Sequence, residues 1–175
     1  FLGGLRASAQ MISFEIPMGL ALLCVILTAG TLMPQQIVAQ QIEGQWYLVQ
    51  QPLAAIVFYI CLLAEANRAP FDLAEAEQEL IGGWHTEYSS MRWALFFMGE
   101  YAAMIVGSAL IVTIFFGGWS LVFGLDTALL QTNGGDWKWY AGFIHLGAFL
   151  VKTIAFILFF IWVRWTVPRF RYDQL

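Results

Sequence analysis

Four long apolar stretches, separated by more polar segments, set the pattern of this chain. They cover about residues 12–33, 50–66, 92–117 and 139–163. A helix needs roughly 20 largely apolar residues to cross a bilayer. Periodicity does not separate strand from helix in such runs, but their length favours helices. The pattern therefore predicts an all-α, polytopic bundle of about four transmembrane spans, forming a single domain over residues 1–175.

Basic residues indicate how the predicted spans are oriented. If the four spans alternate, one side receives all the arginines: Arg6, Arg68, Arg92, Arg164, Arg169 and Arg171. The opposite loops, about 34–49 and 118–138, contain only Lys138 and carry turn signals such as Gly117-Gly118. Positive loops face the cytoplasm. We therefore expect a multi-pass protein of a bacterial inner membrane, with loop 67–91 and the C-terminal end in the cytoplasm.

Composition agrees with lipid as the main solvent. Hydrophobic residues make up 60% of the chain and charged residues 11%, against about 45–50% and about 25% in soluble domains. The net charge of -4 and the lack of a basic stripe argue against a nucleic-acid partner. Cys24 and Cys61 lie in apolar runs, as inert buried thiols do.

The sequence contains none of the common catalytic motifs. It lacks zinc-ligand spacing, a dinucleotide fingerprint, a phosphate-binding loop and a nucleophile elbow. We therefore expect no metal site, no cofactor bound by this chain alone and no independent catalysis.

The 67–91 segment predicts a short acidic helix. Pro70 disfavours a helical conformation just before it. Asp72 suits the N-cap position, and Glu75 follows three residues later in a capping-box pattern. The predicted helix covers about residues 73–81 and ends at Gly82-Gly83.

Several carboxylates crowd this predicted helix. Asp72, Glu75 and Glu79 share one face, whereas Glu77 points elsewhere. Repulsion between close carboxylates favours partial protonation and proton exchange near neutral pH. A solvated acidic loop helix is the simpler alternative.

Three further glutamates fall inside the apolar stretches or at their ends. Glu15 lies about one turn inside the first stretch, Glu65 ends the second, and Glu100 follows Arg92 by eight residues, a rise of about 12 Å. A charge at the bilayer centre costs about 2.5–3.5 kcal/mol on insertion scales, so these residues are functional candidates. Proton transfer is one role; hydrogen bonding between helices is the other.

The fourth stretch contains two more ionisable residues. Lys152 lies near its middle, and His145 lies seven residues earlier on the same face. Lys152 could pair with Glu100, either as a structural ion pair or as part of a proton relay. His145 is more typical of a packing histidine that finds its own partner.

These residues resemble a known family, the H subunit of bacterial NADH–quinone oxidoreductase (respiratory complex I), whose mitochondrial counterpart is subunit 1. The similarity is carried by Glu65-Ala66-Asn67-Arg68-Ala69-Pro70-Phe71-Asp72-Leu73, by His85-Thr86-Glu87-Tyr88-Ser89, by Arg6-Ala7-Ser8-Ala9-Gln10 with Glu15, and by Arg169-Phe170-Arg171-Tyr172-Asp173-Gln174-Leu175. It covers essentially the whole chain.

The resemblance implies a place in a proton-pumping complex. Glu15, Glu65, Glu100, Asp72, Glu75, Glu77 and Glu79 would couple quinone reduction to proton translocation. Arg68, Phe71 and Asp72 would belong to the loop that lines the quinone cavity. Quinone would be the substrate, bound at an interface with other subunits. The implied partners are hydrophilic-arm subunits, including an iron–sulfur subunit, and small membrane-arm subunits next to antiporter-like subunits.

Some features limit what the resemblance implies. Leu73-Ala74-Glu75 replaces the family's usual Leu-Pro-Glu, which would loosen the start of the loop helix. Family members have further spans before Phe1 and after Leu175, so we expect a C-terminal-half segment. Two alternatives stay open: the equivalent subunit of a membrane-bound hydrogenase or ferredoxin-driven complex, and a passive membrane anchor.

Overall fold

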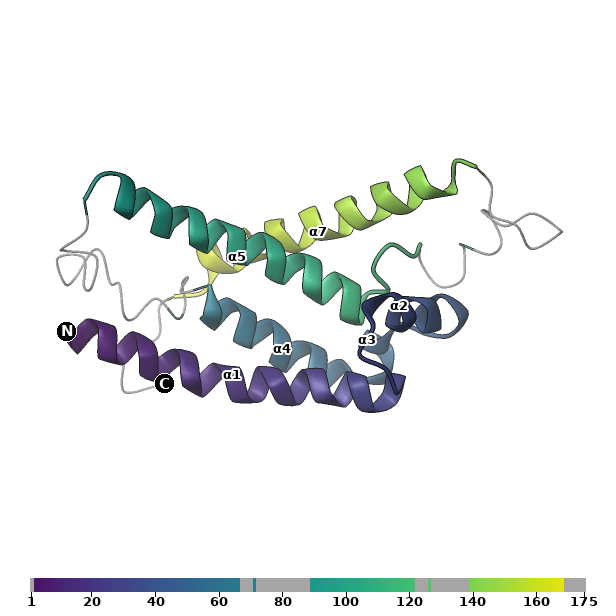
Figure 1. The fold of residues 1–175 in the computed structure, drawn as a ribbon, viewed down its shortest axis with the longest axis horizontal. Coiled ribbons are helices and arrows are strands. Elements are labelled where there is room, and N and C mark those ends of the chain that lie inside the picture. The colour runs from purple at the N-terminus through teal and green to yellow at the C-terminus, as the bar shows by residue number, and fades with distance from the viewer. Residues whose placement is uncertain (1, 67–70, 72–88, 122–125, 127–138, 169–175) are drawn as a thin grey trace.

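The chain folds as a bundle of helices (Figure 1). The computed structural model describes residues 2–66, 71, 89–121, 126 and 139–168. All regular structure in these residues is helical, which confirms the all-α prediction. The helices are α1 (Leu2–Ala29), α2 (Pro34–Glu43), α3 (Tyr47–Gln50), α4 (Pro52–Glu65), α5 (Met91–Phe115) and α7 (Ala141–Thr166).

Three of the helices are long and apolar enough to cross a membrane: Ser8–Ala29 within α1, all of α5 and all of α7. The fourth apolar helix, α4, has 14 residues, a length of about 21 Å at 1.5 Å per residue. This is shorter than the roughly 30 Å of a bilayer's hydrocarbon core. The lengths and compositions of these helices define a polytopic membrane protein.

The long helices pack in pairs. α1 lies along α4, α4 packs on α5, and α5 crosses α7 (Figure 1). The core between α1, α4 and α5 contains fully buried side chains, among them Val25, Phe58, Ile111 and Phe115. We call the end where α4 stops and α5 starts the loop end. The opposite end, where α2 and α3 lie beside the end of α5, is the far end.

The 34–49 segment, expected to be a loop, is largely helical. Pro34 occupies the first turn of α2, where its missing N–H costs no hydrogen bond. Ile37, Val38 and Gln41 point inward and are buried. The helix therefore covers the end of α5.

The outer faces of the long helices are strongly apolar. Leu27 is 78% exposed, Trp139 86% and Trp165 83%. Large apolar faces of this kind are rare on water-soluble monomers. They fit helices whose outer surface meets lipid or other membrane helices.

Candidate functional site

Glu15 and Glu65 line the same small cavity at the loop end. α1 supplies Glu15 from its middle, and α4 supplies Glu65 as its last residue. The cavity holds about 20 Å³ and is otherwise lined by Met11, Phe14, Met18, Cys61 and Ala64. This is room for about one water molecule. The two carboxylates therefore face a common space small enough for one water to bridge it.

Glu65 also lines a second and larger cavity. This one holds about 230 Å³ and lies between α1, α4 and α5. Among the described residues that line it, Glu65 is the one acidic side chain; the others include Met18, Phe58, Leu62 and Val106. Glu65 thus stands between a small cavity shared with Glu15 and a wide apolar cavity that reaches α5.

Glu100 lies on α5 beside this larger cavity, not in its lining. Ala103 and Gly107, three and seven residues further along α5, do line it. Residues with this spacing share one helix face. Glu100, which is half-buried, therefore lies on the cavity-facing side of α5, about one turn closer to the loop end.

Phe71, from the predicted cavity loop, is fixed to α1 beside the two carboxylates. The Gln10 side-chain amide donates a hydrogen bond to the Phe71 carbonyl at 2.9 Å. The Phe71 ring packs edge-on against Phe14, with ring centroids 5.4 Å apart. Because Phe14 also lines the Glu15–Glu65 cavity, one aromatic ring touches both the loop and the carboxylate site.

The remaining loop predictions lie outside the described residues. They concern Arg68, Asp72, Glu75, Glu77 and Glu79, together with the short helix over about 73–81. These stay predictions.

The predicted pair between Lys152 and Glu100 is wrong. The Lys152 ammonium donates instead to the carbonyls of Phe116 at 2.8 Å and Ser120 at 2.6 Å, at the far end. Phe116 is sixteen residues beyond Glu100 in sequence, roughly 24 Å along a helix axis. Lys152 reaches the end of α5 rather than its middle because α7 crosses α5 at an angle (Figure 1).

The far end contains a buried acid that sequence reasoning missed. Asp126 is fully buried and accepts hydrogen bonds from the Leu121 N–H at 2.9 and 3.0 Å. His145 Nδ1 lies 2.9 Å from the Trp119 carbonyl, as expected of a packing histidine, and 3.5 Å from the Asp126 carboxylate. An aspartate in a predicted loop gave no signal of this burial.

Fold and site together define a helical membrane protein with carboxylates gathered where its helices meet a loop. The profile of the NADH dehydrogenase family matches residues 1–175, and the chain belongs to this family.

Three relatives illustrate the similarity. They are the NADH-quinone oxidoreductase H subunit from Flavobacterium psychrophilum (45% identity), the first of the numbered H subunits from Geobacter sulfurreducens (49%) and NADH-quinone oxidoreductase subunit 8 from Rhodothermus marinus (47%). Each similarity covers 99% of this chain and 49%, 45% and 52% of the relative, respectively. The chain thus spans about half the length of the relatives it matches.

Proposed function

We propose that this chain is the membrane-embedded H subunit of a proton-pumping NADH–quinone oxidoreductase, and that Glu65 couples events in the 67–91 loop to the membrane interior. The observation that carries the proposal is the small cavity shared by Glu15 and Glu65. The relatives' names supply the reaction of the whole complex.

The first step of the coupling is electrostatic. Quinone reduction takes up protons and changes charge beside the loop. Two carboxylates that face one small space cannot both hold a negative charge without strong repulsion. A charge change nearby would therefore move a proton between Glu15 and Glu65, or reorient one of the two side chains.

The second step is mechanical contact with the loop. Phe71 is held on α1 by Gln10 and by Phe14. A displacement of the loop would therefore press on the Phe14 ring, which forms part of the cavity wall. In this proposal Phe71, with Arg68 and Asp72, belongs to the loop that lines the quinone cavity.

The third step carries the change toward α5. Glu65 faces the larger cavity, and Glu100 lies on the cavity-facing side of α5. Since the described lining is apolar apart from Glu65, transfer to Glu100 requires water to enter the cavity when Glu65 changes charge. Asp72, Glu75, Glu77 and Glu79 would supply and exchange protons at the loop.

The remaining parts of the proposal follow from the family. The loop end faces the bacterial cytoplasm, where an iron–sulfur subunit of the hydrophilic arm covers it. Quinone is bound at that interface as a substrate. Small membrane-arm subunits next to the antiporter-like subunits receive the change that leaves Glu100.

The proposal is tested by Glu65→Gln and Glu15→Gln in the assembled complex. We expect NADH-driven proton translocation in inverted membrane vesicles to fall several-fold in both variants, while native gels show normal assembly. Glu65→Asp should restore part of the activity because it keeps a carboxyl group. Glu43→Gln is the matched control, since Glu43 is exposed at the end of α2, and it should pump normally.

The alternatives predict other outcomes. Full proton translocation per NADH in both glutamine variants would contradict the coupling role. A passive anchor predicts either failed assembly or unchanged activity, never a complex that assembles and pumps poorly. In a hydrogenase-type or ferredoxin-driven relative, a photoreactive quinone analogue would label no subunit of the intact complex beside this loop.

A further inference from the structure

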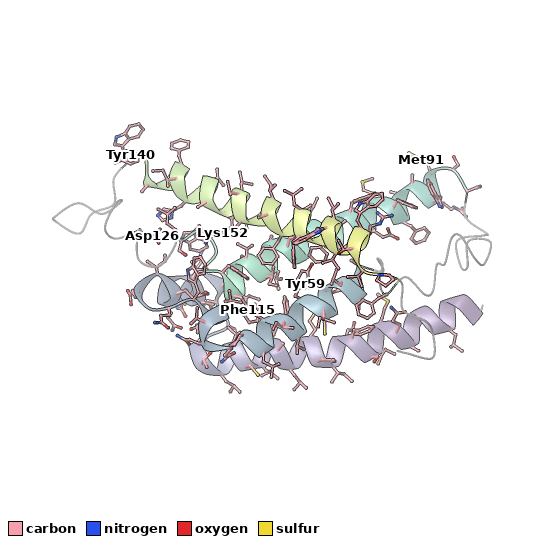
Figure 2. All side chains as sticks on the ribbon, turned by 180° about the vertical axis from the view of Figure 1, so that it is seen from behind. Tyr59, Met91, Phe115, Asp126, Tyr140 and Lys152 are labelled. Atoms are coloured by element: carbon pink, nitrogen blue, oxygen red, sulfur yellow. The ribbon has the colours of Figure 1, made fainter. Side chains whose placement is uncertain are left out.

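The far end encloses one ammonium group within main-chain acceptors. Lys152 Nζ donates to the carbonyls of Phe116 at 2.8 Å, Gly118 at 3.3 Å and Ser120 at 2.6 Å. The Trp46 ring lies below it, with its centroid 4.6 Å from Nζ. Figure 2 shows Lys152 close to Asp126, at the end of the molecule opposite Met91. An ammonium has three N–H donors, and each one has a carbonyl here.

Two glycines shape this enclosure. Gly117 and Gly118 follow the end of α5 with φ angles of +71° and +53°, which L-amino acids with a side chain rarely adopt. They turn the chain so that alternate carbonyls, from Phe116, Gly118 and Ser120, converge on Lys152. A Cβ atom on Gly118 would also lie 2.8 Å from Val38. We call the three carbonyls with the Trp46 ring the carbonyl cage.

The carbonyl cage favours a positive charge. Phe116 is the C-cap of α5, and the last carbonyls of a helix carry partial negative charge. An indole ring attracts a cation over its face. Asp126 lies near enough to attract Lys152 electrostatically, and its other acidic or basic neighbour in the described structure is His145.

The same partners make Lys152 a poor proton carrier. Amide carbonyls and an indole face accept hydrogen bonds or attract charge, but they do not take up a proton near neutral pH. The ammonium is thus used for holding structure together. It connects α7 with the end of α5 and with Trp46, which lies between α2 and α3.

We propose that the carbonyl cage is a binding site for a primary ammonium group, which Lys152 fills and thereby locks α7 to the end of α5. Lys152 is a positioning residue, and protons do not travel through it. This inference stands independently of the role proposed for Glu65, because it concerns the opposite end of the bundle.

The test is chemical rescue of Lys152→Ala in the assembled complex. This substitution empties the carbonyl cage and leaves a space that n-propylammonium fits. We expect the variant to lose heat stability, measured as the Tm of the purified complex, and n-propylammonium in the buffer to restore most of the loss. Tetramethylammonium should not rescue, because it is a cation without N–H donors.

A double variant serves as the matched control. Lys152→Ala with Gly118→Ala should show no rescue, because the added Cβ distorts the carbonyl cage itself. The single Gly147→Ala variant should behave like the unaltered protein, since nothing lies within 4 Å of a Cβ at that position in α7.

A second measurement avoids variants that fail to assemble. Acetic anhydride acylates only a neutral amine, so Lys152 in the intact complex should resist the reagent until the protein is denatured, as read by mass spectrometry. Rapid acylation in the native complex would overturn the proposal. So would a Lys152→Met complex that keeps its full Tm and loses proton translocation, which is the behaviour of a proton carrier.

Discussion

At the scale of single residues, Gln41 shows how a buried side chain can replace missing main-chain partners. Its amide nitrogen donates to the Ile114 carbonyl at 3.0 Å. Its oxygen accepts from the N–H groups of Gly117 at 3.0 Å and Tyr47 at 3.3 Å. Gln41 thus ties α2 and α3 to the last turn of α5, where helical hydrogen bonding stops.

We predict that Gln41→Leu destabilises the far end. Leucine has a similar size but leaves the Gly117 and Tyr47 N–H groups buried without a partner, at about 1–3 kcal/mol for each group. The Tm of the purified complex should fall clearly. Gln35→Leu, on the exposed side of the same helix, is the control and should leave Tm nearly unchanged. Equal effects of the two substitutions would contradict this account of Gln41.

The sequence indicated which residues matter better than which residues meet. Glu15, Glu65 and Glu100 stood out as charges within apolar stretches, and the structure places Glu15 and Glu65 on one cavity. The partner of Lys152 was predicted wrongly, because main-chain carbonyls have no sequence signature. An ammonium site built from carbonyls therefore becomes visible only once the chain is folded.

At the scale of helices, Gly107 sets how closely α4 and α5 approach. A Cβ atom at this position would lie 3.0 Å from Leu62 Cδ2 on α4. Small residues allow membrane helices to pack closely. Gly107 also lines the 230 Å³ cavity next to Glu65, so the same residue shapes both the packing and the proposed route toward α5.

We therefore predict that Gly107→Val separates α4 from α5 and narrows this cavity. The complex should assemble less well and, where it assembles, pump fewer protons per NADH in vesicles. Gly99→Val on the same helix is the control, since a Cβ there meets nothing within 4 Å. A Gly107→Val complex with normal yield and pumping would show that this contact has no role.

The helices differed in how well they could be predicted. α5 and α7 are long apolar runs, and their ends agree with the expected 92–117 and 139–163 to within a few residues. α2 was missed because a glutamine-rich stretch resembles a loop when charge and hydropathy alone are considered. Its signals were Pro34 at the start and the inward spacing of Ile37 and Gln41.

At the scale of the whole molecule, the two ends have different chemistry. The loop end has carboxylates that face shared cavities, whereas the far end has an ammonium enclosed by carbonyls. α5 joins the two ends, with Glu100 near its start and Phe116 just after its last residue. A rigid, anchored far end would direct any charge-driven movement of α5 to its loop end, where Glu65 lies. The sequence alone could not show this polarity, because it depends on α7 crossing α5.

The central claim is that Glu15 and Glu65 change protonation or environment when quinone is reduced. The most direct test is redox-induced infrared difference spectroscopy of the assembled complex, in the region where protonated carboxyl groups absorb. We predict a carboxyl band that changes on quinone reduction, is lost in Glu65→Gln, is altered in Glu15→Gln and is kept in Glu43→Gln. An identical difference spectrum in the unaltered complex and all three variants would contradict the account.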